Sequence, residues 1–286
     1  MVVALHRSID GPGPGWPEAS QEAASRSIGG FAFVVTVPHA SGAAPHWQGA
    51  AANTAEWRDV VAGSHHALDR GAGELAKDMG ARLGAPVIEG LCSRLFIDLN
   101  RPLDDPSVIA SAIDGRDLMF NRAISGGDLA SRRTAHRHYH QRVAGVIAAA
   151  AQPVYLVDQH SFDRFGPAPA ARGVDIGVCA PGDDRFARTL LDSLLKRTSP
   201  RRAEDQPKAA ARILNVRLNE PYSADHPGAY IMRRHMPVTA GGVVIEVCDD
   251  LLADDADVGA IAELLSEALV ETASAMSSTF AAGESA

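Results

Sequence analysis

Short, continuously apolar runs alternate along the chain with longer amphipathic stretches, and this alternation limits the possible folds more than any other feature. Continuous apolar runs are typical of strands that are covered on both faces of a sheet. We expect strands at residues 31–37, 86–90, 94–98, 154–157, 174–178 and 243–247, and a strand followed by a turn at residues 213–222. We expect helices at residues 64–83, 128–151, 183–198 and 254–276. This order predicts an α/β fold with three layers, α/β/α, around a mostly parallel, mixed central sheet.

The 286 residues fit one α/β domain, which we place at residues 31–280. Residues 1–30 are rich in Pro, Gly and Ser and are expected to form a flexible N-terminal extension. They contain no apolar segment typical of a secretory signal. No stretch approaches the ~20 apolar residues that span a bilayer. We therefore expect a cytoplasmic protein without a membrane partner, in which Cys92, Cys179 and Cys248 are buried free thiols.

The formal charge of −8 comes with no basic stripe, so a nucleic-acid partner is not expected. A small molecule is the expected partner, and the sequence does not predict an oligomeric state. The dense basic cluster at residues 132–142 reads as the polar face of a helix. The residues expected at the surface are His136, His138, His226, His235 and the segment 201–211.

Polar residues stand at or near the ends of four predicted strands. They are His39, the pair Asn100 and Arg101, His160, and Glu246, which lies within its strand. In open α/β sheets, ligands bind beyond the carboxyl ends of the strands. These side chains are therefore candidates for one active-site edge.

His39 and His160 suit a zinc site, which needs neutral imidazole nitrogens and a third protein ligand. Asp158 lies two residues before His160 and could hold the orientation of that imidazole. The alternative is that each histidine is a loop residue bonded to the backbone. Residue types and placement alone leave both interpretations open.

Several motifs together resemble the N-formylglutamate amidohydrolase family. The resemblance covers roughly residues 31–270, with the motifs in the family order. They are Pro38-His39, Ser93 to Arg101, Asp158 to Phe162, Asn219 to Tyr222 and Ile245-Glu246-Val247. It is specific chiefly because an Arg before Asp-Leu-Asn-Arg is combined with the later His-Ser-Phe and Glu-Val. The resemblance implies a phosphorylase/hydrolase-like fold shared with zinc carboxypeptidases and aspartoacylases, in which a mixed sheet lies between helical layers.

The resemblance also implies an activity, the hydrolysis of a small N-acyl amino acid such as N-formylglutamate. Asn100 and Arg101 would hold the substrate carboxylate, Arg101 through a bidentate fork. Arg94 would stabilise the oxyanion or hold a second carboxylate. Glu246 would be the general base that activates water and passes the proton to the leaving amine.

The same resemblance implies that Zn²⁺ is bound by His39 first and His160 last. Carboxypeptidases and aspartoacylases take a second ligand as Glu three residues after the first His, but Gly42 occupies that position here. The segment Ser64 to Ala72 resembles a family stretch in which a His and a later Asp recur at the start of a helix, so the resemblance favours Asp69 as the ligand, with His65 next. These two residues are four apart and share one face of the predicted helix. The alternative is that Asp69 caps the helix and that His65 lies on the surface.

Other functions remain rivals to an N-acyl amino acid hydrolase. A metallopeptidase or a deacylase of another acyl group would use the same residues. A non-catalytic carboxylate-binding protein of this fold is favoured by Gly42. A serine hydrolase is disfavoured because no Gly-x-Ser-x-Gly elbow is present. The Tyr139-His140 pair, in the predicted helix 128–151, is expected to serve packing or to support other residues rather than to bind metal.

Overall fold

The computed structural model describes residues 30–45, 64–165, 172–182, 184–199, 213–225 and 228–283. Nearly all of the expected N-terminal extension, the expected surface loop 201–211 and His226 lie outside these residues. The extension and the single domain at 31–280 therefore stay predictions. No helix of the described part is long and apolar enough to span a bilayer.

The centre of the fold is a six-stranded sheet with strand order β2-β1-β5-β8-β6-β7. β2, β1, β5 and β8 run parallel, whereas β6 pairs with β8 in the antiparallel sense. β7 lies parallel to β6. The strands are β1 (Ala32–Val37), β2 (Val87–Glu89), β5 (Val154–Phe162), β6 (Ile176–Cys179), β7 (Val216–Leu218) and β8 (Gly241–Cys248). The expected mostly parallel, mixed sheet is confirmed.

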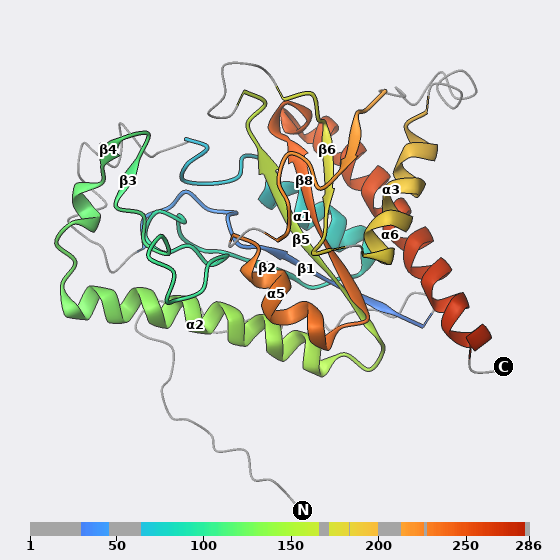
Figure 1. The fold of residues 1–286 in the computed structure, drawn as a ribbon, viewed down its shortest axis with the longest axis horizontal. Coiled ribbons are helices and arrows are strands. Elements are labelled where there is room, and N and C mark those ends of the chain that lie inside the picture. Colours follow the sequence, from blue (N-terminus) through green and yellow to red (C-terminus); the bar gives the residue numbers. More distant parts are fainter. Residues whose placement is uncertain are drawn as a thin grey trace, which may run out of the picture.

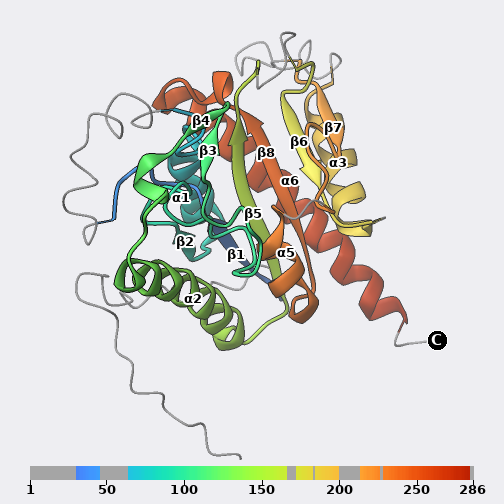
Figure 2. The same cartoon turned by 60° about the vertical axis from the view of Figure 1, so that its left-hand side comes forward.

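Helices cover both faces of this sheet (Figures 1 and 2). α2 and α5 lie on one face, and α1, α3 and α6 lie on the other. The α-helices are α1 (Ala72–Leu83), α2 (Gly126–Ala149), α3 (Arg185–Arg197), α5 (Tyr230–His235) and α6 (Asp255–Gly283). Three 3-10 helices, η4 (Met119–Asn121), η5 (Met236–Val238) and η6 (Asp249–Leu252), and a hairpin of β3 (Ala112–Ile113) and β4 (Arg116–Asp117) complete the described elements. The predicted three-layer architecture is confirmed.

Alternate side chains of the strands enter two different cores. Phe33 and Val35 of β1 pack with α1, α3 and α6, whereas Val34 packs with α2 and α5. In β5, Tyr155 and Val157 enter the first core, and Leu156 enters the second. Successive side chains of a strand point to opposite faces, so an apolar residue at every position is required where both faces are covered.

Two predicted elements were wrong. The predicted helix at residues 64–83 begins only at Ala72, and residues 65–71 form turns. The predicted strand at 94–98 is a turn followed by a loop. Its Leu95 and Phe96 pack in a separate cluster with Ala67 and Leu118, so the run is apolar because it is buried, not because it is extended.

The buried face of α2 also differs from the expectation. Arg132 is fully buried and donates to the carbonyl of Phe96 at 2.8 Å and to Asn121 Oδ1 at 2.6 Å. His136 and His235 are 2 % and 3 % exposed, so their predicted surface positions were wrong. The segment between β2 and α2 packs against the buried face of α2, through contacts such as that of His136 with the Arg101 carbonyl. The three cysteines are buried and free, as predicted.

Candidate active site

Polar side chains replace apolar ones at the carboxyl ends of three parallel strands. Asp158 and His160 continue in β5 on the face where Leu156 packs with α2, and Glu246 lies on that face of β8 beside His160. Thr36 occupies the corresponding face at the end of β1 and donates to Asp158 Oδ1 at 2.7 Å. His160 therefore lies within its strand, not after it as the sequence suggested.

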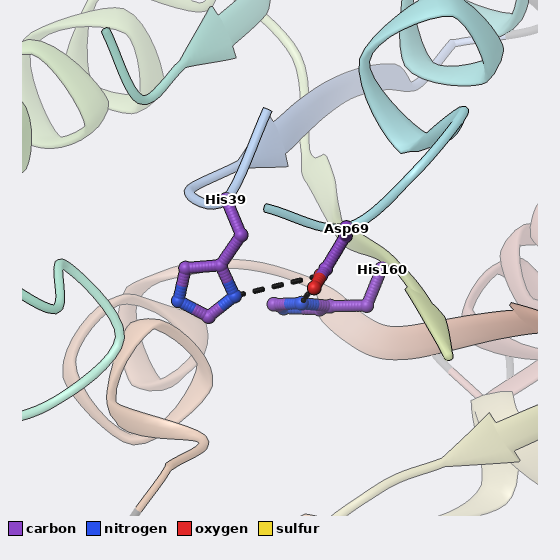
Figure 3. Close-up of side chains that lie close together, drawn as sticks. All are labelled: His39, Asp69 and His160. Atoms are coloured by element: carbon purple, nitrogen blue, oxygen red, sulfur yellow. Dashed lines mark hydrogen bonds and ion pairs between the residues drawn. The ribbon is translucent and has the colours of Figure 1, made fainter. Parts of the chain in front are cut away.

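His39, Asp69 and His160 form one buried group at this edge (Figure 3). His39 follows β1, His160 belongs to β5, and Asp69 comes from the turns that precede α1. The amide of Asp69 donates to the carbonyl of His39 at 3.0 Å, which fixes the two loops together. Asp69 Oδ2 lies 2.8 Å from His160 Nδ1 and 3.5 Å from His39 Nδ1. His65 is exposed and lies outside this group.

Each imidazole also contacts a second carboxylate, through the ring nitrogen on the side away from Asp69. His39 Nε2 lies 2.8 Å from Asp98 Oδ1, and His160 Nε2 lies 3.1 Å from Asp158 Oδ2. An ionised carboxylate accepts only, so Nε2 of His39 carries the proton. His160 has a carboxylate within hydrogen-bond distance of each ring nitrogen, with Asp69 at Nδ1 and Asp158 at Nε2. The Nδ1 atoms of both rings face Asp69. Histidines that bind metals are oriented by carboxylates in this way.

The group fits a divalent metal ion. The ligand atoms offered by the three residues all lie within 4.8 Å of one another. His39 Nδ1 is buried and has no hydrogen-bond partner among the described residues. A buried lone pair without a partner is costly, and a metal ion would satisfy it. Two imidazoles and one carboxylate are a donor set typical of transition metals.

Burial and charge keep the His39 imidazole neutral. Desolvation and then the Arg94 guanidinium lower the pKa of His39 to about 4. Burial also acts to lower the pKa of His160, but Asp158 and Glu246 outweigh it, so that this pKa is raised. Asp158 thus favours charge on His160, whereas a metal ligand must be neutral.

Glu246 and Arg94 face the same group with unused polar atoms. Glu246 Oε2 and Arg94 Nε are buried and have no hydrogen-bond partner among the described residues. Arg94 donates through Nη2 to Asp69 Oδ1. Burial raises the pKa of Glu246, although His160 and Arg94 oppose the shift. Burial also disfavours the charged form of Arg94 and therefore lowers the pKa of that side chain.

Asn100 and Arg101 also line the cavity, and both have partners within the protein. Asn100 Nδ2 donates to Asp158 Oδ2 at 3.3 Å, and its Oδ1 accepts from the amide of Ile231 at 2.9 Å. Arg101 pairs with Asp98 at 3.3 Å and with Asp105 at 3.4 Å. Their expected contact with a substrate carboxylate stays a prediction.

All seven residues expected in the site line one cavity of about 260 Å³. The cavity also contains Asp98 and Arg172, to which the sequence pattern assigned no catalytic, binding or metal role, and Tyr222, which the Asn219 to Tyr222 motif contains. Asp98 belongs to the Asp-Leu-Asn-Arg motif, which could have indicated it. Arg172 has no comparable signal in the sequence. A small molecule with a polar reacting group and anionic substituents suits this lining.

The mixed three-layer sheet and the buried His-Asp-His group at its carboxyl edge define an α/β protein with an enzyme-like site whose residues could hold a metal ion. The chain belongs to the N-formylglutamate amidohydrolase family, whose sequence model matches residues 31–253. This range contains all seven expected site residues.

Solved structures that are similar to the chain include the following two. A gene product of Agrobacterium tumefaciens is 28 % identical, with a TM-score of 0.73, over 90 % of this chain and 94 % of that chain. The N-formylglutamate amidohydrolase of Ralstonia eutropha JMP134 is 18 % identical, with a TM-score of 0.59, over 90 % and 97 %. The second likeness supports the fold. No curated protein matches the chain in sequence.

Proposed function

We propose that the protein is a zinc-dependent amidohydrolase that removes the formyl group from a small N-acyl amino acid such as N-formylglutamate. The observation that carries this proposal is the buried group of His39, Asp69 and His160, with two Nδ1 atoms turned toward one carboxylate. The family membership supports the amide as the bond that is cleaved.

His39, Asp69 and His160 would hold the zinc ion. When bound, zinc supplies a Lewis acid for the acyl carbonyl and lowers the pKa of a ligated water toward ~7. Asp98 and Asp158 keep both imidazoles in the tautomer that presents Nδ1 to the metal.

Glu246 is the proton carrier of the reaction. Its Oε2 atom takes a proton from the attacking water, whose oxygen forms a bond to the acyl carbon. The carbon–nitrogen bond then breaks, and Glu246 returns the proton to the leaving amine. For a formyl substrate, the products are formate and the free amino acid. The Arg94 Nε proton is available to the oxyanion that develops on the acyl oxygen.

The cavity offers positions for two substrate carboxylates. Arg101 and Asn100 are proposed to bind the first, through the planar fork of the guanidinium. Arg172 is the candidate for the second. Its guanidinium lies 5.5 Å from the centre of the Phe162 ring and 4.9 Å from that of Tyr222, and Nη1 donates to the Tyr222 hydroxyl at 2.7 Å. Arg172 has no carboxylate partner among the described residues, which supports an acidic substrate side chain.

The proposal is tested by metal-dependent hydrolysis. Protein stripped with chelator and resupplied with one equivalent of Zn²⁺ should release formate from N-formyl-L-glutamate. N-acetyl-L-glutamate and N-formyl-L-glutamine should be poorer substrates, because one changes the acyl group and the other removes the second carboxylate. Absence of metal-dependent hydrolysis across a panel of N-acyl amino acids would overturn the proposal. Binding of zinc and glutamate without turnover would favour the carboxylate-binding alternative, and cleavage of peptides alone would favour a metallopeptidase.

A further inference from the structure

The loop that carries Asn100 and Arg101 is held from behind by two buried histidines of α2. His136 Nε2 lies 2.7 Å from the carbonyl oxygen of Arg101, and His140 Nε2 lies 3.0 Å from that of Leu99. The carbonyl between them, that of Asn100, accepts from the amide of Tyr230 at 3.2 Å. Three successive peptide carbonyls are therefore bound by α2 and α5.

A third histidine, His235, determines which ring nitrogen of His140 carries the proton. A carbonyl only accepts, so His140 must carry its proton on Nε2, and its Nδ1 must accept. His235 Nε2 lies 3.0 Å from that Nδ1 and is therefore the donor. Burial lowers the pKa of His140 to about 2 and that of His235 to about 4, so both rings are neutral near pH 7. The ring centroids lie 5.2 Å apart and the ring planes differ by 21°, as expected for two rings joined by an in-plane hydrogen bond.

The same loop faces the candidate site with its side chains. Asn100 Nδ2 reaches Asp158, and Arg101 Nε reaches Asp98, which are the two carboxylates behind the imidazoles of the proposed zinc site. A rotation of the peptide at Leu99 or Arg101 would therefore move the guanidinium and the amide that face the substrate. Each carbonyl has its own histidine donor, and both donors are nearly inaccessible to water.

We propose that His136 and His140 are positioning residues for substrate binding, which orient Asn100 and Arg101 by donating to the backbone carbonyls of residues 101 and 99. His235 supports this arrangement by holding His140 in the required tautomer. The proposal rests on the proposed function for the identity of the bound group, a substrate carboxylate. It assigns the three histidines a role in substrate affinity, not in proton transfer or metal binding.

The kinetic test compares His140→Phe with His140→Gln. Phe keeps the ring volume but removes the donor, whereas Gln can keep a donor nitrogen near the Leu99 carbonyl. We expect His140→Phe to raise KM for N-formyl-L-glutamate by about 10- to 100-fold, with kcat and zinc content within about threefold of the wild type. His140→Gln should recover most of the loss. His138→Gln, which changes a half-buried histidine of the same helix, is the matched control and should leave KM unchanged.

The increase in KM caused by His140→Phe should disappear in a protein whose residue 101 no longer binds the substrate carboxylate. In an Arg101→Met background, adding His140→Phe should change KM by less than about twofold, because coupled residues are not additive. A KM that is unchanged in His140→Phe, or a loss confined to kcat or zinc content, would overturn the proposal. A lower thermal stability with normal KM would show that the residue serves stability alone.

A readout without turnover separates this proposal from the proposed function. Long-range ¹⁵N–¹H NMR of the metal-free protein should show His136, His140 and His235 as neutral Nε2–H tautomers. Isothermal titration of L-glutamate should show weaker binding to His140→Phe than to the wild type. An Nδ1–H tautomer at His140 would contradict the proposal even if the enzyme deformylates its substrate. Absence of hydrolysis with these NMR and binding results would instead contradict the proposed function.

Discussion

At the scale of single residues, each histidine of the candidate metal site divides its two ring nitrogens between two carboxylates. His39 uses Nε2 for Asp98, and His160 uses Nε2 for Asp158, which leaves both Nδ1 atoms on the side of Asp69. Asp69 itself also accepts from Arg94. The protein thus orients these three side chains toward one another by its own contacts, which would lower the cost of binding a metal ion there.

Glu246→Gln tests the proposed general base. The change keeps the size of the side chain and removes the atom that takes the proton, so zinc should still bind. We expect kcat to fall by about 10²- to 10⁴-fold with one zinc per chain retained. Steady-state kinetics and metal analysis of the same sample provide the measurement. Turnover close to that of the wild type would remove Glu246 from this role.

Asp69→Asn tests the third metal ligand. The amide is isosteric but carries no charge, so both the zinc ligand and the ion pair with Arg94 are weakened. We expect zinc affinity to fall by at least about tenfold, measured by competition with a chromophoric chelator. His65→Asn is the matched control, because that exposed imidazole lies outside the His-Asp-His group. A larger loss in His65→Asn than in Asp69→Asn would identify His65 as the ligand.

At the scale of elements, the site depends on where a strand or helix ends and a loop begins. β1 ends just before His39, and the turns before α1 bring Asp69 back beside it. Gly71 makes the last of these turns with φ of 74°, in the left-handed region that favours glycine. A Cβ atom at Gly71 would lie 2.5 Å from Leu252 Cβ. This position therefore couples the packing of η6 to the placement of Asp69.

Gly71→Ala should destabilise the protein and weaken zinc binding together. The added methyl group meets Leu252, and the backbone conformation is unfavourable for alanine, so we expect a loss of about 1–3 kcal/mol of unfolding free energy. Urea denaturation and zinc titration provide the measurements. Gly145→Ala is the control on the exposed side of α2, near its C-terminal end, where no atom outside the local helix backbone lies within 4 Å of the added group. That change should stabilise the protein by roughly 0.5–1 kcal/mol. Equal changes in unfolding free energy and zinc binding for Gly71→Ala and Gly145→Ala would contradict the role given to the Gly71 turn.

At the scale of the whole molecule, burial of neutral histidines makes folding depend on pH. The pKa values of His39 and His235 are lowered by burial to about 4, and that of His140 to about 2. In the unfolded chain these groups titrate near 6.5. Their stabilising contribution is thus complete above pH 6.5 and is lost progressively as the pH falls toward the folded-state values. His160 has a raised pKa and acts in the opposite sense, since its contribution is lost as the pH rises.

We therefore expect the metal-free protein to lose stability steeply between pH 6.5 and 4. Each buried neutral histidine contributes a slope of up to about 1.4 kcal/mol per pH unit, before relaxation reduces it. Urea unfolding at pH 7.5, 6, 5 and 4.5 provides the measurement. His235→Gln should be less stable at pH 7.5 but should show a smaller slope, whereas His138→Gln should keep the slope of the wild type. An unfolding free energy that is constant from pH 7 to pH 5 would contradict this expectation.

Much of the fold could be predicted because its signals are local. The apolar runs that became β1, β5 and β8 and the N-cap at Asp184, whose side chain accepts from the amide of Ala187, depend on neighbouring residues only. The segment 91–125 could not be predicted, since its apolar residues divide between two packed clusters without regular spacing. The buried histidines of α2 could have been found, because His136, His140, Val143 and Ile147 follow one helical stripe.

The sequence by itself determined the three-layer architecture and the strands that bring His39, His160 and Glu246 to one edge. Parallel neighbouring strands end at the same edge, so local strand signals are enough to place those residues together. The tertiary structure alone brought Asp69 between the two imidazoles and Asp98 behind His39, because both come from irregular segments whose path is set by distant contacts. It also decided that His235 is buried, because this residue packs against His140 of α2, which is 95 residues away in the sequence. No local pattern contains that contact.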